Sequence, residues 1–280
     1  MKTTKKKLTI GDIHGRSTWK NILFGSPANF ENWVASEFYL DIFELYDYDK
    51  IIFVGDYVDS FTIGNVEMKK NLEDLITLKR AQPDRVELLI GNHDVSYIIE
   101  GEYCSGFRPE MKWDFRDLYE KNMELFKLAH YEEVHEEGDF PRKVLWTHAG
   151  VTLGWWDHMV IPLFDNPNHR FAEQLKELKG RRIDQVLNFL WEIRSYTLFT
   201  VDYHSGGMSA WAGPLWVRPE MLNEWWFPGY DQIVGHTPQH SIWMVDLPDD
   251  CVNSKEQDRI IYVDTLEYGD NSVHIIESKC

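Results

Sequence analysis

The sequence predicts an α/β (α+β) fold in which two mixed β-sheets pack as a sandwich flanked by helices. The first half of the 280-residue chain alternates short apolar runs with amphipathic stretches. This βαβαβ order is typical of a mainly parallel sheet. Three apolar runs near the C-terminus follow one another at hairpin-like spacing. They indicate a second, antiparallel-rich sheet that packs on the first.

Five elements are expected in the first half of the chain. Strands should run up to Ile10, over 50–54 and over 86–90, because each segment is an apolar or β-branched run followed by a turn. Helices should cover 30–46 and 66–81. In the second of these helices, apolar side chains recur mostly three or four positions apart, at Met68, Leu72, Leu75, Ile76 and Leu78.

The second half of the chain has a different order of expected helices and strands. A helix is expected over 115–130 and a strand over 143–147. A long helix-rich insert follows, at about 152–230, and it holds seven of the twelve tryptophans. Since large aromatic side chains mostly bury their surface, most of these should pack the insert against the core. The last three strands should lie at 241–246, 259–264 and 272–278.

The composition suits one large catalytic domain. With 43% hydrophobic and 14% aromatic residues, the chain can bury a sizeable core. The motifs described below span 11–238, so a single domain over 1–280 that includes the insert is expected. A net charge of −17 argues against a broad nucleic-acid groove, because clustered Lys and Arg bind phosphate backbones. No stretch approaches the roughly 18 apolar residues of a membrane span, so we expect no membrane contact.

The number and spacing of the cysteines indicate the cellular compartment of the protein. Cys104, Cys251 and Cys280 are too few and too scattered for a disulfide framework or a structural zinc site. The basic N-terminus reaches a predicted turn after a short apolar run, which leaves no room for the core of a signal peptide. We therefore expect a reducing, cytoplasmic location. No sequence feature indicates the oligomeric state.

Five short segments each place a metal-capable side chain directly after an apolar run. Because open α/β sheets bind ligands at the carboxyl ends of their strands, these side chains should meet. Carboxylate and amide oxygens suit hard cations while imidazole suits Mn, Fe or Zn, so the mixed set favours those metals. One such segment alone is no more than a turn, but five in this order indicate a two-metal phosphoesterase site. The segments are GDIHG (11–15), GDYVD (55–59), GNHD (91–94), THAG (147–150) and GHTP (235–238).

These motifs resemble those of the calcineurin-like metallophosphoesterase superfamily. The match is best with its phosphoprotein-phosphatase branch, which includes bacterial and phage serine/threonine phosphatases and diadenosine-tetraphosphatase relatives. The resemblance covers 7–150 and 213–268 and implies the αββα sandwich of that superfamily. It also implies two divalent metal ions, Mn²⁺ in the first instance, with Fe or Zn as alternatives. The implied ligands are Asp12 and His14 for the first ion, Asp56 as the bridge, and Asn92, His148 and His236 for the second.

The resemblance further implies a mechanism. A hydroxide shared by the two metals would attack phosphorus in line, since two cations lower the pKa of a shared water. His93 would protonate the leaving oxygen, and Asp59 would orient its ring. An alkoxide leaves poorly, so an imidazole held by a carboxylate is a suitable acid. The simpler interpretations are a structural histidine and a turn-capping aspartate.

Several positions depart from the pattern of the family. Ser60 stands where an arginine usually clamps the phosphate, which removes a bidentate cation. Arg218 matches a second clamp of the bacterial branch, and Arg16 is a further phosphate-binding candidate, although an exposed salt-bridging arginine is the simpler interpretation there. Pro238 replaces a metal histidine of the wider superfamily, as in the phosphoprotein-phosphatase branch, so the first ion should keep more water. Asp94 is typical of the wider superfamily rather than of that branch.

Three functions are compatible with these residues. The first is a dinuclear-metal phosphomonoesterase resembling serine/threonine phosphatases, with a phosphoprotein or a small phosphoester as its partner. The second is a dinucleoside polyphosphate or phosphodiester hydrolase, for which loss of His93 should matter less when the leaving group is a weak base. The third is a non-catalytic metal-binding interaction module, which the lost arginine at Ser60 would favour.

Overall fold

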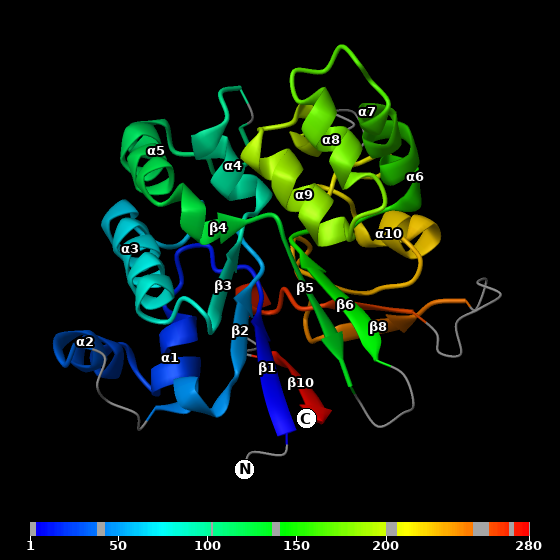
Figure 1. Ribbon diagram of the computed structural model, residues 1–280. Coiled ribbons are helices and arrows are strands. Elements are labelled where there is room, and N and C mark those ends of the chain that lie inside the picture. The colour runs from blue at the N-terminus through cyan, green and yellow to red at the C-terminus, as the bar shows by residue number, and fades with distance from the viewer. Residues whose placement is uncertain are drawn as a thin grey trace.

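Two five-stranded mixed sheets pack face to face, with helices outside them, as the sequence predicts (Figure 1). The computed structural model describes residues 4–37, 43–101, 103–135, 141–199, 206–248, 258–268 and 272–279.

The first sheet has the order β10-β1-β2-β3-β4. Strands β1 to β4 are parallel, and β10 pairs antiparallel with β1. The strands are β1 (Thr4–Ile10), β2 (Lys50–Phe53), β3 (Val86–Leu89), β4 (Phe126–Lys127) and β10 (His274–Lys279).

The second sheet has the order β5-β6-β7-β9-β8. Its three inner strands are parallel, and β5 and β8 are antiparallel edges. The expectation that 272–278 belongs to this sheet is wrong, because β10 pairs with β1 of the first sheet. Hairpin-like spacing does not reveal which sheet offers an unpaired edge. The strands are β5 (Ala129–Val134), β6 (Arg142–Thr147), β7 (Asp231–Val234), β8 (Trp243–Asp246) and β9 (Arg259–Tyr262).

Helices cover the outer face of the first sheet (Figure 1). Helix α3 matches the predicted 66–81 helix closely. The other two expected helices are placed less well, since 30–46 ends early and 115–130 gives way to strands β4 and β5. The helices are α1 (Thr18–Phe24), α2 (Pro27–Ala35), α3 (Asn65–Ala81), α4 (Asn92–Ile98) and α5 (Lys112–Lys121), with 3₁₀ turns at Glu44–Asp47, Pro109–Met111 and Met123–Leu125.

The start of α2 explains one of these differences. The Ser26 hydroxyl accepts a hydrogen bond from the backbone N–H of Asn29 at 3.2 Å, and Pro27 opens the helix. A serine cap followed by proline is a strong start signal, and it lies upstream of the apolar spacing used for the prediction. Residues 38–42 of the expected helix lie outside the described residues.

The insert is helical, as expected, and gathers above the second sheet (Figure 1). Trp155 and Trp191 are buried within it, whereas Trp211 and Trp225 are 55% and 46% exposed. The prediction that its tryptophans pack inward therefore holds for part of the set. Its elements are α6 (Leu153–Trp155), a π-turn (Trp156–Val160), α7 (Ile161–Phe164), α8 (Ala172–Leu178), α9 (Ile183–Glu192), a 3₁₀ turn (Tyr196–Phe199) and α10 (Pro219–Trp225).

The two sheets bury an apolar layer between them. Val54, Leu89, Val144 and Ile233 are among its buried side chains, and they come from both sheets. The indole N–H of Trp146 donates to the hydroxyl of Thr9 at 2.9 Å, which ties the second sheet to the first. Burial of such side chains contributes about 25 cal/mol per Å² of apolar surface, so this layer fixes the relative position of the sheets. The carboxyl ends of their parallel strands consequently meet along one edge.

None of the helices in the described residues is long and apolar enough to cross a membrane.

Candidate functional site

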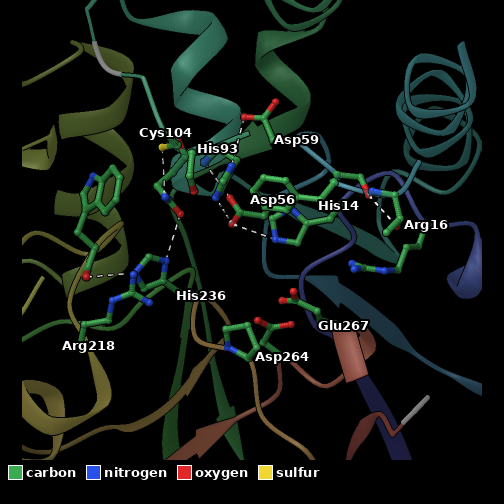
Figure 2. A pocket seen from close by; sticks show the side chains of 17 residues that line it. His14, Arg16, Asp56, Asp59, His93, Cys104, Arg218, His236, Asp264 and Glu267 are labelled. Carbon is green, nitrogen blue, oxygen red and sulfur yellow. Dashed lines mark hydrogen bonds and ion pairs between the residues drawn. The ribbon is translucent and has the colours of Figure 1, made fainter. Parts of the chain in front are cut away.

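Ligand-type side chains from five strand ends meet in one place. They follow β1, β2 and β3 of the first sheet and β6 and β7 of the second. The pocket there is lined by residues of four of the five motifs (Figure 2). The six predicted metal ligands that the structure brings to this edge are Asp12, His14, Asp56, Asn92, His148 and His236.

Asp56 lies at the centre of this cluster. Its Oδ2 is 3.5 Å from Nε2 of His148, 3.8 Å from Nε2 of His14 and 4.0 Å from Nε2 of His93. Its Oδ1 accepts a hydrogen bond from the backbone N–H of His93 at 2.9 Å. One carboxylate thus faces ring nitrogens from three strand ends, as a bridging ligand would.

The donor atoms fall into two groups that share Asp56. Asn92 joins the second group, because its Oδ1 lies 2.8 Å from Nε2 of His148 and 3.1 Å from Nδ1 of His236. Imidazole, carboxylate and amide donors together suit Mn, Fe or Zn. Within each group the ligand atoms lie within 4.8 Å of one another, and the groups are His14, Asp56 and His93, and Asp56, His148 and His236.

In the three predicted histidine ligands, the ring nitrogen that points away from the cluster faces a backbone carbonyl. Nδ1 of His14 and Nδ1 of His148 lie 3.0 and 2.9 Å from backbone carbonyls. Nε2 of His236 lies 3.1 Å from the carbonyl of Trp216. Each of these nitrogens therefore carries the proton, and the opposite nitrogen turns its lone pair toward the cluster.

Asp12 is buried and is held by the GHTP motif. Its two oxygens accept from the backbone N–H of His236 at 2.9 and 3.2 Å, and it belongs to neither three-residue group. A Cβ on Gly235 would lie 2.1 Å from Oδ1 of Asp12, so this approach requires glycine. The first group holds His93 beside His14 and Asp56.

Backbone strain is concentrated at the site. His14, Asp56, Asp59 and His236 have φ angles of 43°, 53°, 63° and 67°. A non-glycine residue in this left-handed region costs about 1–2 kcal/mol. Surrounding hydrogen bonds hold the strain, for example the 2.7 Å bond from the N–H of His14 to the carbonyl of Asp56. The side chains are therefore fixed in place before any ligand binds.

Asp94 acts as a brace between two motifs. Its Oδ2 accepts from the backbone N–H groups of Asp56 and Gly91, each at 2.9 Å. Its Oδ1 accepts from the N–H of Tyr57 at 2.9 Å and from the hydroxyl of Tyr119. This carboxylate is fully buried and holds the GDYVD turn against the start of α4.

His93 is held by a second carboxylate. Its Nδ1 lies 3.2 Å from Oδ2 of Asp59, and the hydroxyl of Tyr97 donates to Oδ1 of Asp59. Burial lowers the pKa of His93, but Asp56 and Asp59 outweigh burial and raise it to about 9. The ring is therefore protonated at neutral pH in this geometry.

The imidazole rings of the second group, those of His148 and His236, remain neutral. Burial lowers the pKa of His148, and burial together with His148 lowers that of His236 well below its usual range. Burial alone would raise the pKa of Asp56, yet His148 and the other surrounding histidines outweigh burial and lower it. Neutral imidazoles around an ionised carboxylate are the protonation states that metal binding requires.

Both predicted arginines line the pocket, on opposite sides (Figure 2). Arg218 donates from Nε to the carbonyl of Gly206 at 3.1 Å and from Nη1 to the hydroxyl of Thr237 at 3.2 Å. Within the described part of the chain, the guanidinium of Arg16 donates only to the carbonyl of Ile13, at 3.5 Å. Arg218 is thus the better fixed of the two.

No other arginine replaces the clamp missing at Ser60 among the described residues. The Ser60 hydroxyl accepts from the backbone N–H groups of Thr62 and Ile63 at 3.2 and 3.1 Å. Arg108 donates to the carbonyls of Ser60 and Ile63 from behind this turn and does not line the pocket. It supports the loop instead of reaching into the pocket.

Two residues of the site were missed by the sequence analysis. Nδ2 of Asn92 donates to Sγ of Cys104 at 3.3 Å, which turns Oδ1 toward the histidines. Burial raises the pKa of Cys104 to about 12, so it is a thiol and no nucleophile. Asp264 lies two residues after β9 and lines the pocket. Its segment RIIYVD repeats the pattern of an apolar run followed by a carboxylate, which is the signal that could have identified it.

The fold and the site define a class, the metal-dependent phosphoesterases. The calcineurin-like phosphoesterase model matches residues 6–240, so the chain belongs to the calcineurin-like phosphoesterase family. This membership makes the protein a metal-dependent hydrolase of phosphoric esters and disfavours the non-catalytic interaction module.

The comparison with solved structures found phosphatases, of which the first described here has the same fold. A cold-active protein-tyrosine phosphatase of a psychrophilic Shewanella species is 17% identical with a TM-score of 0.50, and the match covers 97% of this chain and 75% of that one. A protein serine/threonine phosphatase from Saccharomyces cerevisiae is 11% identical with a TM-score of 0.41, covering 100% of this chain and 81% of that one. A comparison with curated proteins gave no match.

Proposed function

We propose that this protein is a dinuclear-metal phosphomonoesterase whose substrate is a phosphoprotein or a small phosphoester. Residues 1–280 would form one catalytic domain, since ligands come from strand ends spread over most of the chain. The three scattered cysteines support a cytoplasmic location.

The residues present fit two divalent cations. The first ion would be held by Asp12, His14 and Asp56. The second ion would be held by Asp56, Asn92, His148 and His236. The neutral histidines and the central carboxylate support this assignment. When bound, such ions polarise phosphoryl oxygens and lower the pKa of water. Mn²⁺ is the first choice, because three of the six side chains offer oxygen and the other three offer imidazole nitrogen, a mixture that Mn²⁺ accepts.

His93 is proposed as the general acid. The observation that carries the proposal is its double contact, with Nδ1 on Asp59 and Nε2 directed at Oδ2 of Asp56 in the centre of the ligand cluster. A protonated ring in this orientation donates its Nε2 proton toward a leaving oxygen next to the ligand cluster, while Asp59 keeps the ring from turning. An ester needs this proton more than an anhydride does, which favours the monoesterase over polyphosphate hydrolysis.

Arg218 is proposed to bind the phosphate. It lines the pocket near His236, and its two hydrogen bonds hold the guanidinium at the rim. Burial lowers its pKa, yet an arginine remains charged at neutral pH. Arg16 on the opposite side would add charge without a fixed geometry.

A substrate panel tests the proposal. Metal-free protein reloaded with Mn²⁺ should hydrolyse phosphopeptides and aryl or alkyl phosphomonoesters faster than bis-aryl phosphodiesters and dinucleoside polyphosphates. The reverse order would support the diester or polyphosphate alternative. Binding of two ions without turnover of any of these substrates would contradict both.

A further inference from the structure

Asp264 occupies a place equivalent to those of the predicted metal ligands. Strand β9 runs parallel to β7, and Asp264 follows its end as His236 follows the end of β7. A Cβ on Gly11 would lie 2.9 Å from Cα of Asp264, so the end of β9 packs directly against the residue before Asp12. Asp264 therefore lies at the end of a sixth strand, β9, which reaches the same edge of the sandwich as the other five.

The carboxylate of Asp264 is buried against another carboxyl group. The residue is 1% exposed, its side chain lies beside that of Asp12, and no backbone N–H or basic side chain among the described residues donates to either oxygen. Its charge acts on Asp12 and Asp56, which are also carboxylates. Burying an ionised group costs several kcal/mol unless a cation or hydrogen bonds compensate.

The charge of Arg16 favours the ionised form of Asp264, but no cation among the described residues donates a hydrogen bond to it. Arg16 lines the same pocket, but no ion pair within 4.0 Å joins it to Asp264 in the described part of the chain. Glu267 faces the pocket beside Asp264 and adds a further negative charge (Figure 2). Pro238 lines the same pocket and offers no ligand atom.

We propose that Asp264 belongs to the first metal site, where it ligates the ion of Asp12 and His14 or holds a water bound to it. This inference rests on the proposed dinuclear function. It makes the first site richer in carboxylate than the second, with Asp12, Asp56 and Asp264 against one histidine. Such a site prefers a hard cation such as Mn²⁺ over Zn²⁺, whereas the site of His148 and His236 does not.

Titration calorimetry with MnCl₂ on the metal-free protein tests the assignment. The wild-type protein should bind two ions. Asp264→Asn keeps the shape of the side chain and removes its charge, so one of the two affinities should fall by about tenfold to a hundredfold. The matched control is Glu267→Gln, because Glu267 lies on the same wall but is exposed, and its variant should bind Mn²⁺ as the wild type does.

Thermal melting separates metal binding from a structural role. Saturating Mn²⁺ should raise the melting temperature of Asp264→Asn less than that of the wild type, while the metal-free variant melts no lower than the metal-free wild type. A lower melting temperature without metal, together with unchanged Mn²⁺ affinity, would show that Asp264 only supports the fold and would overturn the inference. If the wild type itself binds no metal, the proposed function fails instead.

Discussion

Nδ1 of His93 and Oδ2 of Asp59 lie 3.2 Å apart, and this contact fixes the direction of the opposite ring nitrogen. Asp59 is fully buried and has a positive φ, so it can hold the ring without reorganisation. In the proposed mechanism the pair would make the half-buried His93 a directed proton donor, and the first two predictions concern this role.

Replacing His93 by Asn should slow ester hydrolysis according to the leaving group. For alkyl phosphates we expect kcat to fall by about 10²–10⁴, the usual contribution of a general acid. For p-nitrophenyl phosphate, whose leaving group needs little protonation, the loss should be small. Steady-state kinetics over a series of phenyl phosphates measures this, and equal losses across the series would remove His93 from the acid role.

The pH dependence of kcat/KM should report the protonation of His93. Since the carboxylates raise the pKa of His93 to about 9, the acid is protonated below that pH and lost above it. Bound cations would offset the charge of Asp56 and move this limb downward, toward the ordinary pKa of about 6.5. We expect kcat/KM for an alkyl phosphate to fall tenfold per pH unit above a midpoint between 6.5 and 9. The His93→Asn variant should lack this limb; a limb that persists unchanged belongs to another group.

Replacing Asp56 by Asn should remove at least one metal ion and nearly all turnover. Asp56 is the residue that both groups of ligand atoms share, so its charge is the one both ions need. Metal content by elemental analysis and turnover of an aryl phosphate check this. Circular dichroism should show a folded variant, and kinetics identical to the wild type would contradict the bridging role.

Replacing Arg218 by Ala should weaken phosphate binding more than chemistry. The inhibition constant of free phosphate should rise by about tenfold to a hundredfold, as expected for the loss of a charged hydrogen-bond donor worth about 1.5–3 kcal/mol. Arg16→Ala is the matched comparison, since Arg16 has one long contact and should contribute less. Inhibition equal to that of the wild type in Arg218→Ala would place Arg218 outside the phosphate site.

Replacing Asp94 by Asn should destabilise the fold. An amide in this position would turn an NH₂ group toward backbone N–H donors that the carboxylate now accepts from. Leaving such buried donors unsatisfied costs about 1–3 kcal/mol each, so we expect a loss of roughly 2–4 kcal/mol in urea denaturation. The control is Asp117→Asn, an exposed residue paired with Lys121 one helical turn away, which should change stability by less than about 0.5 kcal/mol. If both changes had comparable effects, the hydrogen bonds of Asp94 would not be what stabilises this part of the fold.

The structure brings the predicted ligand residues to one edge of the sandwich, whereas periodicity misplaced two of the expected helices. Each predicted ligand follows a strand end, so the topology of parallel strands brought His148 and His236 to residues more than 50 positions away. Helix α2 was misplaced because the Ser26 cap, and not the apolar spacing, sets its start. Strand β10 was assigned to the wrong sheet because pairing depends on which edge is open.

The contribution of Cys104 could not be predicted. A thiol in a loop becomes informative only when folding brings it against the amide of Asn92. Asp264 is different, since its segment has the same strand-then-carboxylate form as the motifs. It was passed over because no glycine or histidine marks the turn around it.

The origin of the ligands has a consequence for the life of the protein in a cell. Asp12, Asp56 and Asn92 extend from one sheet and His148 and His236 from the other, so bound ions would tether the two halves of the sandwich. A ligand that binds only the folded state shifts the equilibrium away from the opened chain, which is the form that proteases degrade. The amount of this protein that survives should therefore follow the metal supply of the cell, even where its catalytic activity is not in demand.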